Sequence, residues 1–396
     1  MPGLSPAGPV PYEHHEGDEG EGIGVLLGQE VLAGELKDLG ACEILVLNRA
    51  VSFQGDKELL YKANLWLRTC ISIIQPIEYF NAHNEDSLYN GVKAINLEKY
   101  FDINQTFAIN SAINSEFFNH SQYVSLKSKD AIVDQFREKT GERPSIDTVN
   151  PDIKINIHIV NNKCTVSLDS SGNTLNKRGY RDTTGFAPMN EVLAAGLILL
   201  SGWDKKTDFI DPMCGSGTIL IEAAMIANNI APNTQRPSFG FQNWDDYDHT
   251  LWSKVKAEAL AVQKDSETLF FGYDISEKTL QIATKNILNA GLNSKIKLKQ
   301  ADVRQLKSPV SEGVVITNPP YGERLQMDNI EEFYKELGDT LKKGFQNHDA
   351  WLISSNKDAL KNIGLRTSRK MTLINGSLEC KFHKYEMYRG SKKNVG

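Results

Sequence analysis

Short apolar runs and amphipathic repeats alternate along the first 80 residues, after an acidic, Gly/Pro-rich start. A helical pattern ends at Gly40, and a second one begins at Asp56, a suitable N-cap residue. Two helices among short strands predict a small α+β unit over residues 25–79. Its expected elements are helix 25–39, strands 44–47 and 50–53, helix 56–69 and strand 71–77.

A second α+β unit is expected over residues 80–170. Its last two strands alternate apolar and polar residues, and the pair Asn161 and Asn162 between them suits a tight hairpin turn. The expected elements are helix 86–94, strand 106–113, helix 122–139, and strands 154–160 and 163–169.

Longer helices alternate with strands from about residue 186 onward. This alternation predicts right-handed βαβ units, a mainly parallel sheet and the α/β fold class. Ligands of such sheets bind beyond the carboxyl ends of the strands, so chemistry is expected there. The expected strands are 208–210, 269–273, 296–300, 314–317 and 350–354, and the helices are 189–201, 218–228, 277–290 and 330–342.

The composition is that of a globular protein, with 40% hydrophobic and 24% charged residues in a chain of 396. No stretch approaches the roughly 18 apolar residues that span a bilayer. Residues 1–24 have the composition of a disordered tail and not of a secretory signal. Five scattered cysteines without a CxxC pair argue against disulfides and a zinc site, and favour a reducing, cytoplasmic location.

The formal net charge of −6 is unevenly distributed. Residues 1–50 hold nine acidic and two basic side chains, whereas residues 351–396 hold three acidic and ten basic ones. The basic stretch is a candidate phosphate-facing region. A solvated Lys-rich surface with a loose tail explains the same composition, so both interpretations stay open.

The first α/β strand runs into the turn DPMCGSGT at residues 211–218. Gly215 and Gly217 allow a sharp turn and a close approach of a ligand to the backbone. The GxGxxG spacing of dinucleotide-binding turns is missing, and the turn opens with Asp211, which repels a pyrophosphate. S-adenosylmethionine, which carries an ammonium and a sulfonium but no phosphate, suits such a turn. A purely structural glycine turn is the alternative.

Acidic residues also follow the next two strands. Asp274 can accept both hydroxyls of a ribose, although an Asp capping the next helix fits as well. Asp302 can accept from an adenine amino group, or simply lie in a surface turn. With Asp211, the three acids trace an adenosyl cofactor along the edge of the sheet.

The fourth strand ends in Asn318-Pro319-Pro320-Tyr321. The two prolines fix the backbone, which orients two acceptors, the Asn318 side-chain oxygen and the Pro319 carbonyl. Together they can hold both hydrogens of an exocyclic amine and draw its lone pair toward a methyl donor. Tyr321 can stack on the base, an interaction of about 1–3 kcal/mol.

The motifs DPMCGSGT and NPPYGERL resemble those of nucleic-acid amino-methyltransferases that use S-adenosylmethionine. With KRGYRD at 177–182, GFAPMNEVLAAGLILLSGW at 185–203 and residues 48–68 and 121–159, the chain resembles the bacterial THUMP-domain 23S rRNA guanine-N2-methyltransferases. The resemblance implies a ferredoxin-like unit and a THUMP RNA-binding domain before a Rossmann-like methyltransferase domain. The implied division is a tail 1–24, domains 25–79, 80–170 and 171–390, and a tail 391–396. Some family members carry a second methyltransferase domain at the C-terminus. This chain ends soon after one such domain, so only one activity is expected.

The resemblance also implies roles for individual residues. Asn318, Pro319 and Tyr321 would hold the target guanine, and no metal is implied. The implied cofactor-binding residues are Asp211, Met213, Cys214, Gly215, Gly217, Thr218, Asp274, Ile275, Asp302, Val303, Phe186, Pro188 and Glu191.

Basic residues near these motifs are candidate RNA contacts: Lys177, Arg178 and Arg181 before the catalytic domain, and Arg324 after Tyr321. Ordinary surface turns are the alternative for all four. The stretch 229–250 carries Arg236, Phe239, Phe241 and Trp244, which either shape substrate choice or pack in the interior.

The expected reaction is methyl transfer from S-adenosylmethionine to guanine N2 of 23S rRNA, free or in a large-subunit assembly particle. Alternatives are guanine-N2 methylation of tRNA and adenine-N6 methylation of DNA or RNA, because the NPPY-type turn serves both amines. A non-catalytic RNA-binding assembly factor is the rival from another class.

Overall fold

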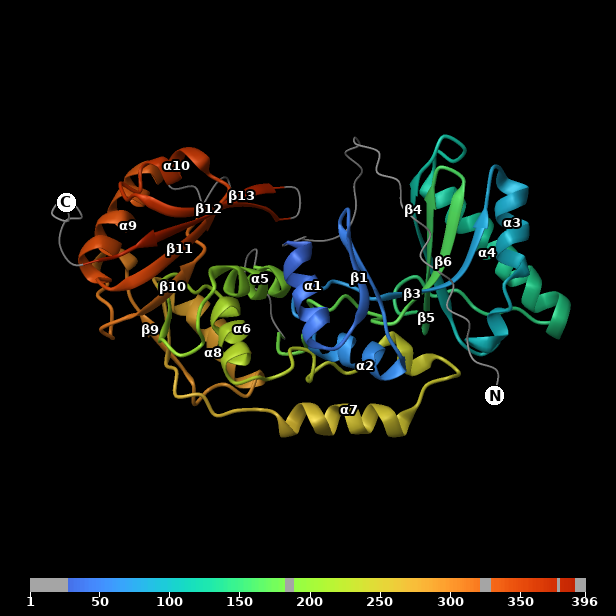
Figure 1. The fold of residues 1–396 in the computed structure, drawn as a ribbon, viewed down its shortest axis with the longest axis horizontal. Coiled ribbons are helices and arrows are strands. Elements are labelled where there is room, and N and C mark those ends of the chain that lie inside the picture. Colours follow the sequence, from blue (N-terminus) through green and yellow to red (C-terminus); the bar gives the residue numbers. More distant parts are fainter. Residues whose placement is uncertain (1–27, 182–188, 321–328, 376–377, 389–396) are drawn as a thin grey trace.

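The computed structural model describes residues 28–181, 189–320, 329–375 and 378–388. The described residues form three sheets along the molecule, whose long axis runs from the sheet within residues 74–169 to the C-terminal sheet (Figure 1). The expected tail 1–24 and the candidate residues Phe186, Pro188, Tyr321 and Arg324 lie outside the described residues.

The first unit lies between the other two (Figure 1) and consists of α1 (Gln29–Asp38), β1 (Cys42–Leu47), β2 (Ala50–Gln54) and α2 (Lys57–Trp66). β1 and β2 form an antiparallel hairpin. Asp56 caps α2 as expected, since its carboxylate accepts a 2.8 Å hydrogen bond from the Leu59 N–H.

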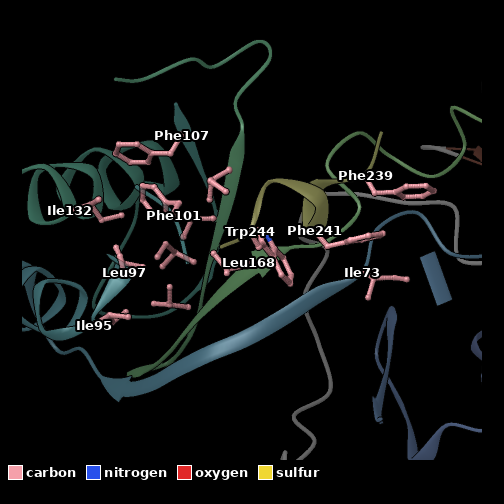
Figure 2. Close-up of a cluster of buried hydrophobic side chains, with 14 of the residues drawn as sticks. Ile73, Ile95, Leu97, Phe101, Phe107, Ile132, Leu168, Phe239, Phe241 and Trp244 are labelled. Carbon is pink, nitrogen blue, oxygen red and sulfur yellow. The ribbon is translucent and has the colours of Figure 1, made fainter. Parts of the chain in front are cut away.

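The second unit is a four-stranded sheet with the order β3-β6-β5-β4, and α3 and α4 pack beside it (Figure 1). β4 and β5 are parallel, and the other neighbours are antiparallel. Phe101, Phe107, Ile132 and Leu168 fill the core between sheet and helices (Figure 2). The elements are β3 (Ile74–Asn81), α3 (Glu85–Ala94), β4 (Phe107–Asn114), α4 (Ser121–Thr140), β5 (Ile153–Val160) and β6 (Lys163–Asp169).

One strand of this sheet was expected elsewhere. The run 71–77 was assigned to the first unit, but the strand starts at Ile74 and pairs with β6 in the second. Ile73 is instead buried in the core (Figure 2). Apolar periodicity marks a strand but does not identify its partner.

The third unit is a seven-stranded sheet with the order β12-β13-β11-β10-β7-β8-β9. β7 to β11 are parallel, and β13 is antiparallel to both neighbours, so the expected mainly parallel α/β fold is confirmed. Its elements are α5 (Glu191–Ser201), β7 (Phe209–Asp211), α6 (Thr218–Ala227), α7 (His249–Ala261), β8 (Phe270–Asp274), α8 (Glu277–Asn289), β9 (Ile296–Gln300), β10 (Gly313–Thr317), α9 (Ile330–Gly344), β11 (His348–Ser354), α10 (Lys357–Lys361), β12 (Thr367–Asn375) and β13 (Leu378–Glu386).

Sequence reasoning missed α7, α10, β12 and β13. β12 is an edge strand whose exposed positions carry cations such as Arg369 and Lys370, which hides the alternation of a strand. Residues 367–375 and 378–386 of the basic C-terminal stretch are therefore paired strands and not a loose tail.

The stretch between α6 and β8 packs against the N-terminal units. Phe239, Phe241 and Trp244 are buried there (Figure 2), and the Phe241 ring stacks on Tyr61 of α2 with ring centroids 4.3 Å apart. A Cβ on Gly240 would lie 2.4 Å from the Asp169 carbonyl oxygen, so this contact requires glycine. The open alternative for this stretch is thus resolved in favour of interior packing.

Candidate active site at the carboxyl edge of the sheet

The candidate site lies where the strand order of the third sheet reverses. β7 has β8 on one side and β10 on the other, and the chain visits β8 and β9 before it returns to β10. Such a switch point leaves a crevice at the carboxyl ends of the strands. Asp211, Asp274 and Thr317 end β7, β8 and β10, and Asn318 follows directly, so the structure brings these residues to one edge.

Asp211 is buried and tied to the neighbouring strand. Backbone pairing of β7 with β10 reaches Ile210 and Val315. Beyond these last paired residues, the Thr317 hydroxyl donates a 2.8 Å hydrogen bond to Asp211 Oδ1, and the Met213 N–H donates one of 3.2 Å to the same oxygen. Burial raises the pKa of Asp211 to about 7, which the hydrogen bonds oppose and the nearby Asp274 carboxylate reinforces.

The glycine turn is fastened to the end of β8. The Cys214 N–H donates 2.8 Å to the Tyr273 carbonyl, and the Gly215 N–H donates 3.1 Å to Asp274 Oδ2. Gly215 has a φ of +54°, and no atom lies within 4 Å of where its Cβ would be. The turn therefore borders open space, as a cofactor-binding turn must. Burial raises the pKa of the Cys214 thiol, which suits a small packing side chain.

Asp274 is not the N-cap of the next helix. That cap is Ser276, whose hydroxyl accepts from the Thr279 N–H at 3.2 Å. Asp274 instead links the end of β8 to the glycine turn, with its other oxygen accepting from the Ser276 N–H at 2.9 Å. Next to it, Ile275 is 63% exposed, so an apolar side chain beside Asp274 is open to a planar ligand.

Asp302 lies one strand further, held by Arg304. Arg304 Nε donates to Asp302 Oδ2 at 2.9 Å, and Nη2 donates to the same oxygen at 2.5 Å. These hydrogen bonds lower the pKa of Asp302 and keep it ionised. Val303 is buried behind it. The local structure is also that of a tight surface turn, because Asp302 Oδ1 accepts from the Arg304 N–H at 3.0 Å.

The turn after β10 presents an unpaired acceptor. Asn318 Oδ1 is buried and has no hydrogen-bond partner in the part of the chain that the structure describes. A buried acceptor without a donor costs about 1–3 kcal/mol, which a ligand with an N–H can recover. Pro319 is buried, and the Tyr334 hydroxyl of α9 donates 3.3 Å to the Pro320 carbonyl. The turn is therefore fixed from two sides, by Thr317 and by Tyr334.

Arg181, which lies in the segment between β6 and α5, contacts the residue that follows the glycine turn. Arg181 Nη2 donates 2.7 Å to the hydroxyl of Thr218, the first residue of α6. The same guanidinium lies 3.2 Å from Glu191 Oε1. Glu191 is buried, which raises its pKa against the opposing effect of Arg181. Two of the implied cofactor-binding residues, Thr218 and Glu191, are thus connected by a residue expected to bind RNA.

The candidate RNA contacts before this domain are placed differently from one another. Lys177 is exposed. Arg178 is only 1% exposed, donates to the Arg68 carbonyl at 2.5 Å and lies 3.5 Å from Glu222 Oε1. That buried position does not suit a phosphate contact, so Arg178 is better explained as part of the packing between units.

Sequence reasoning missed Thr317, Tyr334 and Arg304, which contact the site residues or the turn after β10, and Glu222, which pairs with Arg178. Thr317 and Arg304 are one or two positions from a motif residue, which is the only signal that the sequence offers for them. Tyr334 and Glu222 lie on helices, where only packing reveals their partners. No group of three potential metal ligands occurs among the described residues, and none of the described helices is long and apolar enough to span a membrane.

Family models match three consecutive parts of the chain. They are described as RlmL ferredoxin-like domain (residues 29–73), THUMP domain (82–169) and RMKL-like methyltransferase domain (178–384).

Two relatives that match over 91% of this chain agree with these domain matches. The chain is 40% identical to the provisionally named RNA methyltransferase slr0064 of Synechocystis, over 91% of this chain and 94% of that one. It is 38% identical to ribosomal RNA large subunit methyltransferase K/L of Shewanella frigidimarina, over 91% of this chain and 52% of that protein. The chain thus spans about half the length of the K/L relative.

Among solved structures, SMU.472, provisionally named a methyltransferase and crystallised with SAH, superposes with a TM-score of 0.82 at 33% identity. The superposition covers 92% of this chain and 96% of that one.

Proposed function

The chain belongs to the THUMP-containing RMKL-like methyltransferase family, as its motifs led us to expect, and from that premise we propose that it methylates guanine N2 in 23S rRNA. The observation that carries the proposal is that Asn318 Oδ1, which follows the Thr317 hydroxyl bonded to Asp211, is buried and has no hydrogen-bond partner among the described residues. A target amine supplies the donor that this acceptor lacks.

The expected cofactor, S-adenosylmethionine, is confirmed at the level of the family and by the solved relative with SAH. The residues present fit it, because the turn at Gly215 borders open space and opens with an acid. When bound, the cofactor supplies an activated, electrophilic methyl group. Asp211 and the turn at Gly215 would hold its methionine part, Asp274 the ribose, and Asp302 with Ile275 the adenine.

The remaining work of the protein is to position the amine. Asn318 Oδ1 and the Pro319 carbonyl would each accept one N2 hydrogen, which orients the nitrogen lone pair toward the methyl donor. The base must leave its stack to reach them. The amine carries a strongly acidic proton after transfer, so water beside Asn318 suffices to remove it, and a neutral Asn serves where a base might be expected.

The RNA substrate is supported by the THUMP domain at 82–169. In that domain, Lys127, Lys129, Arg137 and Arg143 line a cavity of about 600 Å³. Lys129 is paired with Asp130, and Arg137 with Asp134. Lys177 is a further candidate contact, and a large-subunit assembly particle is a candidate form of the substrate. We place the reaction in the cytoplasm, in keeping with five free cysteines.

The proposal is tested by mapping N2-methylguanine in rRNA from cells with and without the protein. A single guanine that loses its methyl group is the expected result. N6-methyladenine, or a change confined to tRNA, would instead establish one of the alternative substrates. Tight rRNA binding without methyl incorporation from labelled cofactor would identify a non-catalytic assembly factor.

Two variants connect the reaction to the site. Asn318→Ala is expected to abolish methylation while calorimetric affinity for the cofactor stays within about threefold, since the lost contact is to the base. Asp274→Ala is expected to weaken cofactor binding by at least tenfold, because a hydrogen bond to a charged group contributes about 1.5–3 kcal/mol. Normal turnover by the Asn318 variant would refute the assignment.

A further inference from the structure

The β12–β13 hairpin projects beyond the rest of the catalytic sheet, at the active-site edge (Figure 1). β13 is antiparallel to β11 and to β12, so β12 points the same way as β10 and ends at the edge of Asn318. Ser354, the last residue of β11, pairs with Lys381. Leu378, the first residue of β13, lies three residues before Lys381, so the hairpin extends roughly 10 Å past the end of β11.

The end of this hairpin exposes aliphatic side chains. Ile374 is 46% exposed and Leu378 is 39% exposed. They lie on opposite faces of the hairpin, because directly paired residues share a face: Ile374 is paired with Glu379, and Leu378 is paired with Asn375. The projecting end therefore exposes one apolar side chain on each face, where a bound partner can contact it.

The same hairpin is positively charged, although the chain has a net charge of −6. Residues 366–386 hold five Arg or Lys and two Glu. Glu379 is shared by Lys357 at 2.8 Å and Lys381 at 2.9 Å, which leaves one of the two positive charges uncompensated. Lys370 is exposed and has no ion pair with any described residue. These charges favour a polyanionic partner.

We propose that the β12–β13 hairpin contacts the RNA substrate at the edge of the active site. Ile374 and Leu378 would pack against bases beside the extracted guanine, while Lys370 and Lys381 contact the phosphates. Aliphatic side chains that enter a base stack offset the cost of unstacking in nucleic-acid complexes. This inference rests on the proposed function only in that the substrate is RNA; it does not depend on which base is methylated.

The test compares RNA affinity and cofactor affinity in matched variants, with unmodified 23S rRNA transcribed in vitro as the probe. The double variant Ile374→Ser with Leu378→Ser is expected to raise the KM for RNA roughly tenfold, the size of one lost base contact. Its Kd for the cofactor should stay within twofold. Lys370→Glu should reduce the slope of log Kd for RNA against log salt by about one.

The control is Leu260→Ser with Leu288→Ser, two leucines of α7 and α8 that are 62% and 60% exposed; it should leave both affinities unchanged. An unchanged KM for RNA and an unchanged salt slope would overturn the proposal, as would a change of oligomeric state with normal RNA binding. If thermal melting shows that the double Ser variant is unfolded, the salt dependence of RNA affinity in Lys370→Glu tests the proposal by itself. If the wild-type protein methylates no RNA, the proposed function fails, and direct binding of the transcript still tests the hairpin.

Discussion

The Thr317 hydroxyl, at the end of β10, donates a 2.8 Å hydrogen bond to the buried carboxylate of Asp211 at the end of β7. The last paired residues are Ile210 of β7 and Val315 of β10, so this contact extends the link between the two strands to the turn that carries Asn318. Both side chains are at most 1% exposed. We therefore propose that Thr317 positions both Asp211 and the turn that carries Asn318.

Thr317→Val keeps the shape of the side chain but removes the donor. We expect cofactor affinity to fall roughly tenfold and kcat to fall as well, because a hydrogen bond to a charged group contributes about 1.5–3 kcal/mol. Thr317→Ser should restore both. Calorimetry and single-turnover kinetics measure the two effects.

The matched control for Thr317 is Thr268→Val. Thr268 is 3% exposed and donates 2.9 Å to the Lys205 carbonyl at the opposite edge of the sheet. If Thr268→Val lowers cofactor affinity as much as Thr317→Val does, the effect is one of general stability and the positioning role is refuted.

Asp211 should make cofactor binding depend on pH. Its pKa is raised to about 7, and the ionised form is the one that suits a cationic ligand. Affinity should therefore weaken as the pH falls from 8 to 6, and Asp211→Asn should remove that dependence. A wild-type Kd that is constant over this range would contradict the assignment.

The raised pKa of Asp211 should also make the free energy of unfolding depend on pH. The folded state binds the Asp211 proton more tightly than the unfolded state does, so this group's contribution is fully present below pH 4 and is lost as the pH rises through about 7. The free energy of unfolding of Asp211→Asn should consequently fall less between pH 5 and pH 8 than that of the wild type. Urea titrations at both pH values provide the measurement.

Tyr334→Phe removes the hydroxyl that donates 3.3 Å to the Pro320 carbonyl and lies 2.8 Å from Ser354 Oγ. We expect kcat to fall several-fold while the cofactor Kd is unchanged, because the contact fixes only the Asn318 turn. Tyr61→Phe, another buried tyrosine in the N-terminal core, is the control. Equal losses in both variants would mean that the Tyr334 hydroxyl has no special role.

Glu222→Gln should destabilise the whole chain. Glu222 and Arg178 have fully buried side chains 3.5 Å apart, and Arg178 also binds the Arg68 carbonyl of the first unit. Loss of one partner of a buried pair costs about 3–5 kcal/mol. The control Glu258→Gln affects a half-exposed pair with Lys62 and should change stability by less than about 1 kcal/mol. A similar unfolding midpoint for both variants would show that the Glu222–Arg178 pair does not stabilise the packing between the units.

The sequence by itself determined the α/β class, the order of most elements and the strand ends that carry Asp211, Asp274, Asp302 and Asn318. These features follow from local periodicity and from motifs, which the chain shows without reference to distant residues. Cap positions such as Asp56 were predictable for the same reason.

Only the tertiary structure decided which of these residues act together. Arg178 and Lys177 are adjacent in the sequence, yet one is buried in a joint between units and the other is exposed. β3 joined a sheet that the sequence did not assign to it, and the cation-rich strands β12 and β13 were not recognised at all. Burial, strand partners and the hydrogen bond from Thr317 to Asp211 depend on residues far apart in the chain, so no local pattern encodes them.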